Sequence, residues 1–157
     1  MENNILPIDL KKVINFLKGK KIILTQSKFV RQFESEWSKW LGVKYSVFVN
    51  SGSSANILTL AVLKTMTKKK NIIVPSLTWV SDINAVLFNG FKPVFVDINF
   101  SNLSMKHDDI KRKINKDTAA VFLTHAQGFN GLNKELIDFL KKKNIPLIED
   151  VCESHGA

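Results

Sequence analysis

The sequence predicts an α/β domain of three layers, with a mainly parallel β-sheet between two layers of helices. From residue 45 onwards, short apolar runs alternate with segments of helical periodicity, as in consecutive βαβ units. The apolar runs lack the alternation of a half-exposed strand, which indicates a sheet covered on both faces. The chain has 157 residues, of which 45% are apolar and 24% are charged, so it is long enough to bury such a core.

The first 44 residues predict a helical segment. Apolar residues recur at helical spacing from Asp9 to Leu17, and Gly19 ends this first helix. Ser27 is a candidate N-cap for a second helix, and Gly42 is the residue expected to end it. Apolar residues of this second helix repeat every four positions at Phe29, Phe33, Trp37 and Leu41. Lys20 to Thr25 is a candidate short extended piece.

Residues 45–157 form the predicted α/β domain. The expected strands are Tyr45–Val49, Ile72–Val74, Pro93–Val96, Ala119–Leu123 and Pro146–Ile148. The expected helices are Ser54–Thr65, Val80–Asn89, His107–Ile114 and Asn133–Lys143. Ligands of such sheets bind outside the carboxyl ends of the strands. The candidate site therefore consists of residues 50–54, 75–79, 97, 125–129 and 149–153.

The segment Asn50–Ser54 joins an expected strand to a helix and has the composition of an anion site. The first N–H groups of a helix have no internal partner, and that end of the helix dipole is positive. Gly52 lets a ligand approach the backbone, while Ser53 and Ser54 add hydroxyl donors. The simpler interpretation is that Ser51 or Ser53 is an ordinary N-cap. The segment alone does not decide between the two.

Several polar or aromatic side chains follow the other expected strands. A carboxylate at the end of a buried strand, as at Asp150, is costly unless it is paired. It is a candidate for keeping a ligand nitrogen protonated, or else it caps the next loop or pairs with a lysine. Glu149 should point to the opposite side of the strand, whereas Glu153 can return to the same site. Trp79 offers a stacking surface or packs in the core, and a structural role is the commoner one for His125.

Missing motifs exclude several other classes. The chain lacks the Gly-x-Gly-x-x-Gly of a dinucleotide fold, the Gly-Lys-Ser/Thr of a Walker loop, the Gly-x-Ser-x-Gly of a hydrolase and any Cys/His spacing for a metal. The net charge of +9 is compatible with nucleic acid, but Lys68–Lys70 and Lys141–Lys143 stand where helices end and complement their dipoles. We therefore expect no nucleic-acid and no membrane partner. The single cysteine, Cys152, and the lack of a signal-like start favour a cytoplasmic protein.

Five segments in order resemble the DegT/DnrJ family of pyridoxal-phosphate enzymes, which act on nucleotide-linked keto sugars. They are a lead-in made of Phe33–Glu34 and Leu41–Tyr45, the loop Asn50–Asn56, Pro75–Trp79, Gly90–Ile98 and Ile148–Ala157. The resemblance implies the large domain of a type I pyridoxal-phosphate transferase, in incomplete form. The residues that it implies for the cofactor phosphate are Gly52, Ser53 and Ser54.

The resemblance also implies roles for the strand-end residues. Trp79 would stack on the pyridine ring, and Asp150 would pair with the ring nitrogen and keep it protonated. Glu153 would bind the cofactor near the ring oxygen or lie near the substrate amine, where it is the one candidate catalytic residue. Glu153 together with Trp79 is similar to the branch of the family that removes a sugar hydroxyl.

The resemblance has a gap at the C-terminal end. In the family's aminotransferases a Schiff-base lysine lies a few tens of residues beyond the acidic strand end, and a histidine replaces it in the dehydratases. Neither is matched in this chain, so we expect an N-terminal fragment that is inactive alone. The full enzyme is expected to be a homodimeric aminotransferase for surface polysaccharide or glycoconjugate synthesis, with an amino acid such as glutamate as donor. A sugar dehydratase and a non-catalytic remnant or binding protein are the alternatives.

Overall fold

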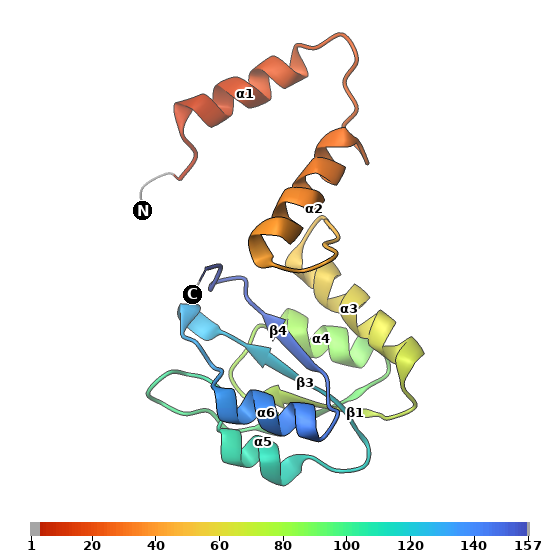
Figure 1. Ribbon diagram of the computed structural model, residues 1–157, viewed down its shortest axis with the longest axis vertical. Coiled ribbons are helices and arrows are strands. Elements are labelled where there is room, and N and C mark those ends of the chain that lie inside the picture. The colour runs from red at the N-terminus through yellow and green to blue at the C-terminus, as the bar shows by residue number, and fades with distance from the viewer. Residues whose placement is uncertain (1–3, 157) are drawn as a thin grey trace. The chain divides into compact units, whose positions relative to one another are not determined.

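The computed structural model describes residues 4–156 and divides the chain into two compact units, with the boundary between Phe48 and Val49. The first unit holds α1 (Pro7–Leu17) and α2 (Lys28–Leu41). The second unit is the α/β part (Figure 1). Its elements are α3 (Gly52–Met66), β1 (Asn71–Pro75), α4 (Val80–Phe88), β2 (Lys92–Val96), α5 (His107–Lys113), β3 (Thr118–Thr124), the 3-10 turn η1 (Ala126–Gly128), α6 (Lys134–Lys142) and β4 (Leu147–Asp150).

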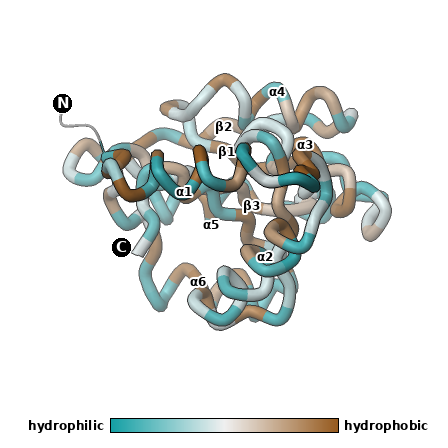
Figure 2. Tube along the Cα trace, turned by 90° about the horizontal axis from the view of Figure 1, so that it is seen from above, coloured by the Kyte–Doolittle hydropathy of each residue, from teal (hydrophilic) through white to brown (hydrophobic). Residues whose placement is uncertain are grey.

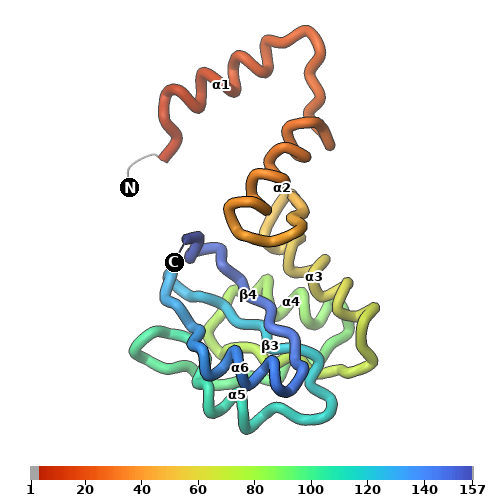
Figure 3. Tube along the Cα trace, in the orientation of Figure 1, coloured from red at the N-terminus to blue at the C-terminus, as the bar shows by residue number. Residues whose placement is uncertain are grey.

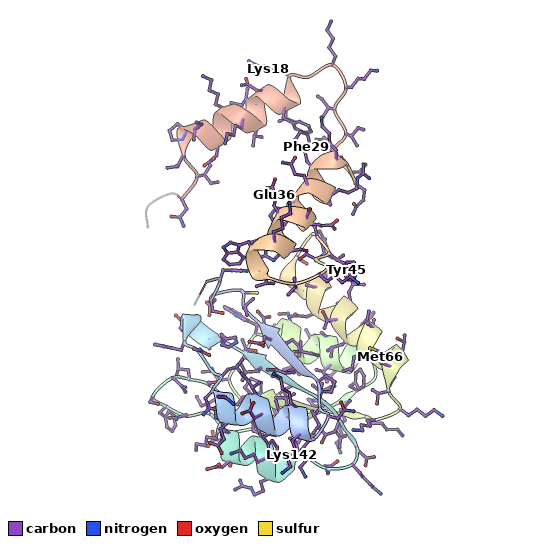
Figure 4. All side chains as sticks on the ribbon, viewed as in Figure 1. Lys18, Phe29, Glu36, Tyr45, Met66 and Lys142 are labelled. Atoms are coloured by element: carbon purple, nitrogen blue, oxygen red, sulfur yellow. The ribbon has the colours of Figure 1, made fainter. Side chains whose placement is uncertain are left out.

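Local signals set the ends of α2 in the first unit. The hydroxyl of Ser27 accepts a hydrogen bond from the backbone N–H of Phe29 at 3.3 Å, and Gly42 ends the helix in the left-handed conformation at φ 73°. Phe33 stacks on Trp37 at a centroid distance of 5.7 Å. Figure 4 labels Phe29 and Glu36 on this helix, and Figure 2 shows hydrophobic and hydrophilic residues alternating around α1. None of the described residues of α1 or α2 is buried.

The second unit is built on a parallel sheet with the strand order β2-β1-β3-β4 among the described residues. Ile73 pairs with Val94 of β2 and with Val121 of β3. Thr124, the last residue of β3, pairs with Asp150, the last residue of β4. The carboxyl ends of these two neighbouring strands therefore stand side by side, as the tubes in Figure 3 also show for β3 and β4.

Helices cover both faces of the sheet, so the α/β prediction of three layers is confirmed. Successive strand residues point to opposite faces. One core joins α3 and α4 to one face, and it contains Leu60, Leu63, Ile72, Val74, Ala85, Val86, Ala120 and Phe122. The other core joins α5 and α6 to the opposite face, and it contains Ile73, Val96, Ile110, Val121, Leu123, Leu136 and Leu140.

The expected strand Tyr45–Val49 is wrong, because these residues form no ladder in the structure. Tyr45 and Val47 are 76% and 78% exposed. A strand requires a neighbouring strand for its hydrogen bonds, and no described strand pairs with this segment. The extended piece expected at Lys20–Thr25 is likewise no strand and consists of bends and loop. The other four expected strands and all six expected helices are present, with ends that differ by one or two residues.

Two further observations concern the part of the chain that the structure describes. No helix in it is both long and apolar enough to cross a membrane. No group of three or more His, Cys, Asp or Glu side chains in it is arranged to hold a metal ion.

Candidate functional site

Asp150 ends β4 and lies in the sheet edge next to Thr124. Asp150 is only 6% exposed. The carboxylate accepts a hydrogen bond at Oδ1 from the backbone N–H of Cys152, at 3.0 Å, and one at Oδ2 from the Asn56 side chain, also at 3.0 Å. Both oxygens of this buried carboxylate therefore have a donor within the protein.

Asn56 connects Asp150 to a second buried carboxyl group. Its Nδ2 atom, which carries two hydrogens, also donates to Oδ1 of Asp82 at 2.8 Å. Asp82 is 2% exposed and lies in the first turn of α4. Its other oxygen, Oδ2, is 2.5 Å from Thr78 Oγ1 and 2.8 Å from Thr124 Oγ1, and these hydroxyl oxygens are 2.7 Å apart. We call Asn56, Thr78, Asp82, Thr124 and Asp150 the carboxyl cluster.

The pKa values of the two carboxyl groups in the cluster shift in opposite directions. Burial raises the pKa of Asp82, and the nearby Asp150 carboxylate adds to this, although hydrogen bonds from the two threonines oppose it. Burial also acts to raise the pKa of Asp150, but the hydrogen bonds from Cys152 and Asn56 together outweigh it, so the net shift is downward. The pKa of Asp150 therefore lies below that of Asp82.

A cavity of about 220 Å³ adjoins the carboxyl cluster. Its lining includes Trp79, Glu153 and Gln127, together with Thr78 and Thr124 of the cluster. Trp79 is 53% exposed, so it is no core residue and its indole surface is available to a ligand. Oε2 of Glu153 accepts a hydrogen bond from the backbone N–H of Gln127 at 2.6 Å, which fixes the glutamate beside the cavity.

The first turn of α3 lies next to the loop after β4. A Cβ atom built on Gly52 would be 3.4 Å from Sγ of Cys152, so the chain passes the loop closely here. Ser51 is the N-cap, and its hydroxyl accepts from the backbone N–H of Ser54 at 3.1 Å. The interpretation of Ser51 as a cap is confirmed, and Gly52 and Ser53 occupy the first helical positions, where N–H groups face outward from the helix end.

His125 and Glu149 belong to the opposite side of the strands. The His125 ring is 6% exposed, its Nδ1 accepts from the backbone N–H of Gly131 at 3.1 Å, and its Nε2 is 3.0 Å from Oε2 of Glu149. Both ring nitrogens are therefore occupied by protein groups, which supports a structural role for His125. Glu149 points away from Asp150, as strand alternation predicts.

Reasoning from the sequence missed Asp82 and the bridging role of Asn56. One signal was available: Asp82 lies three and four positions before Ala85 and Val86, which are buried on the same face of α4. A carboxylate on the apolar face of a helix requires a buried partner. Two of its partners, Asn56 and Thr124, lie 26 and 42 positions away in the chain, which no local pattern shows.

Fold and site together define an α/β domain with a cavity at the carboxyl ends of its parallel strands, next to a buried carboxyl cluster. A sequence model of the DegT/DnrJ/EryC1/StrS aminotransferase family matches residues 5–157. The chain belongs to this family.

Individual relatives agree with this assignment. The chain is 34% identical over 134 residues to the GDP-perosamine synthase of Vibrio cholerae, a match that covers 85% of this chain and 36% of the relative. It is 30% identical to the GDP-4-keto-6-deoxy-D-mannose 3-dehydratase of Escherichia coli O55:H7, over 96% of this chain and 39% of the relative. The chain thus spans well under half the length of these curated relatives.

Solved structures show the same fold. A crystal structure of GDP-4-keto-6-deoxymannose-3-dehydratase with a trapped PLP-glutamate geminal diamine superposes with a TM-score of 0.89 at 31% identity. The match covers 99% of this chain and 41% of that one. Helicobacter pylori PseC, described as an aminotransferase involved in the biosynthesis of pseudoaminic acid, superposes with a TM-score of 0.80 at 26% identity, over 94% of this chain and 39% of that one.

Proposed function

We propose that this chain is the cofactor-binding part of a pyridoxal-phosphate-dependent aminotransferase that acts on nucleotide-linked keto sugars. The observation that carries the proposal is Asp150 at the end of β4, which is 6% exposed and belongs to the carboxyl cluster. Thr78 and Thr124 of this cluster line the cavity that also holds Trp79 and Glu153. Family membership and the relatives' names support it. Residues 1–44 would precede the cofactor-binding domain, which would begin at residue 45.

The residues present fit pyridoxal phosphate. A protonated pyridine nitrogen requires an anionic acceptor, and Asp150 is the ionised carboxylate of the cluster. A flat ring requires an exposed aromatic surface, which Trp79 has. The phosphate requires N–H and hydroxyl donors, which the first turn of α3 holds close to the Asp150 loop through Gly52. The donor set thus matches the three parts of this cofactor.

Each side chain would then have one task. Asp150 would hold the proton on the ring nitrogen, Trp79 would cover one ring face, and Gly52, Ser53 and Ser54 would bind the phosphate. Glu153 would accept a hydrogen bond from the substrate amine or the ring oxygen. When bound, pyridoxal phosphate supplies an electron-accepting ring that stabilises a carbanion on the substrate.

The amino donor would be an amino acid such as glutamate, and the product would serve surface polysaccharide or glycoconjugate synthesis in the cytoplasm. A homodimer is the proposed assembly, and exposed apolar side chains on α1 such as Leu10, Val13 and Ile14 support a covered surface. We propose neither nucleic acid nor membrane as a partner.

Dehydration of the sugar is the second candidate. Glu153 in combination with Trp79 favours it, as does the 31% identity to the dehydratase structure. Product analysis separates the two outcomes: with glutamate and a nucleotide-linked keto sugar, a transferase yields an amino sugar, whereas a dehydratase yields a deoxy sugar.

Cofactor binding is tested by equilibrium dialysis of the chain against pyridoxal 5'-phosphate. We expect Asp150→Asn to weaken binding about 10–100-fold, the equivalent of one charged hydrogen bond of roughly 1.5–3 kcal/mol. Asp97→Asn is the matched control, because Asp97 also follows a strand but pairs with Lys106 at 2.8 Å on the surface. Equal binding by all three proteins would refute the role of Asp150.

A further inference from the structure

Three oxygen atoms of the carboxyl cluster make three mutual contacts, but the two threonine hydroxyls supply only two hydrogens for them. Thr78 Oγ1, Thr124 Oγ1 and Asp82 Oδ2 form a triangle with edges of 2.5, 2.7 and 2.8 Å. Each edge is a hydrogen-bond distance between oxygens and requires one hydrogen. The two hydroxyl groups provide two hydrogens, so an ionised Asp82 would leave one edge with only lone pairs facing each other.

A neutral Asp82 completes the triangle. Its acid O–H would donate to Thr78, the Thr78 hydroxyl to Thr124, and the Thr124 hydroxyl back to the acid oxygen. Asp82 is also 2% exposed and shares the Asn56 amide with a second carboxyl group, so two negative charges here would be costly.

We propose that Asp82 is a positioning residue that carries the single proton of this buried carboxyl pair and thereby keeps Asp150 as its ionised member. Asn56 couples the two groups, because one amide nitrogen donates to both. The proposal deepens the proposed function and rests on it, since Asp150 is there the partner of the ring nitrogen. Asp82 would act through Asp150 and would not touch the cofactor.

Few titratable groups lie near Asp82 and can affect its protonation. Among the described residues, the titratable groups that face Asp82 are Asp150 and Cys152. The carboxylate of Asp150, followed by burial, raises the pKa of the Cys152 thiol to about 11, so this thiol is neutral at physiological pH. Asp150 is therefore the one negative group that bears on the protonation of Asp82.

The test is a pH titration of the side-chain carboxyl carbons of the 157-residue chain by ¹³C NMR, without cofactor. We expect Asp150 to lose its proton at lower pH than Asp82, with an interval in which only Asp150 is charged. Ionisation of Asp82 first, or of both groups together in the ordinary range of aspartate, would overturn the proposal. This measurement requires no variant and does not depend on cofactor binding.

Variants separate positioning from a structural role. Asp82→Asn keeps a neutral group and should leave the titration of Asp150 unchanged, whereas Asn56→Ala should move it to higher pH because a donor is lost. Asn89→Ala is the matched control, since the Asn89 amide donates only to the backbone oxygens of Ile57 and Ala85. Equal shifts in the Asn56 and Asn89 variants would contradict the coupling.

Addition of pyridoxal 5'-phosphate completes the experiment. We expect the Asp150 titration to move to lower pH while Asp82 stays protonated. If the cofactor fails to bind but the order of titration holds, the proposed function falls and the proton assignment stands. If the cofactor binds but the order is reversed, the proton assignment alone is overturned.

Discussion

Asp150→Asn should destabilise the fold as well as weaken cofactor binding, although the two side chains have the same shape. Both Asp150 oxygens accept from N–H groups, those of Cys152 and Asn56. An amide offers one oxygen, so in either orientation its NH₂ group faces another donor at about 3 Å. A buried donor that loses its partner costs about 1–3 kcal/mol. For a chain of 157 residues this corresponds to a fall in Tm of about 2–12 °C.

The assay is urea denaturation of four proteins: the original chain, Asp150→Asn, Asn56→Ala and the double variant. The clash between donors requires the Asn56 amide, so Asp150→Asn should cost less in the Asn56→Ala background, by about 1 kcal/mol or more. In an Asn89→Ala background its cost should be unchanged. A loss below about 0.5 kcal/mol for Asp150→Asn, or additive effects of Asp150→Asn and Asn56→Ala, would refute the reasoning.

Three further predictions concern stability and reactivity. Leu136→Ala, at a fully buried position of α6, should lower the free energy of unfolding by about 2–5 kcal/mol in urea denaturation, and a smaller loss would mean that the core relaxes around it. Because burial raises the pKa of Asp82 above its ordinary 3.8, its contribution to stability is fully present below pH 3.8 and is lost as pH rises through the folded value. The free energy of unfolding of Asp82→Asn should therefore lack this decline, and parallel pH curves for the two proteins would contradict it. With its pKa of about 11, Cys152 should have a thiolate fraction of only ~0.001 at pH 8, so iodoacetamide should label it far more slowly than free cysteine, even though the residue is exposed.

Most secondary structure was predictable because its causes are local. The cap Ser27 and the left-handed Gly42 that bound α2 act within one turn of the helix. All residues of β3 are buried, and most of them form a continuous apolar run, because both faces of the sheet are covered. The prediction of a strand at Tyr45–Val49 was wrong because a strand needs a neighbouring strand to pair with, and the local sequence pattern does not show whether one is present.

The sequence by itself determined the parallel α/β fold and the place of Asp150 and Trp79 at the ends of strands, since hydrophobic periodicity fixes both. It also carried the family resemblance through the segments that join strands to helices. Only the tertiary structure decided which groups meet Asp150. Asn56 is 94 residues from it in sequence, and Asp82 reaches the same amide from α4. Hydrogen bonds between such distant residues, and the protonation states that follow from them, depend on three-dimensional packing, which no local pattern encodes.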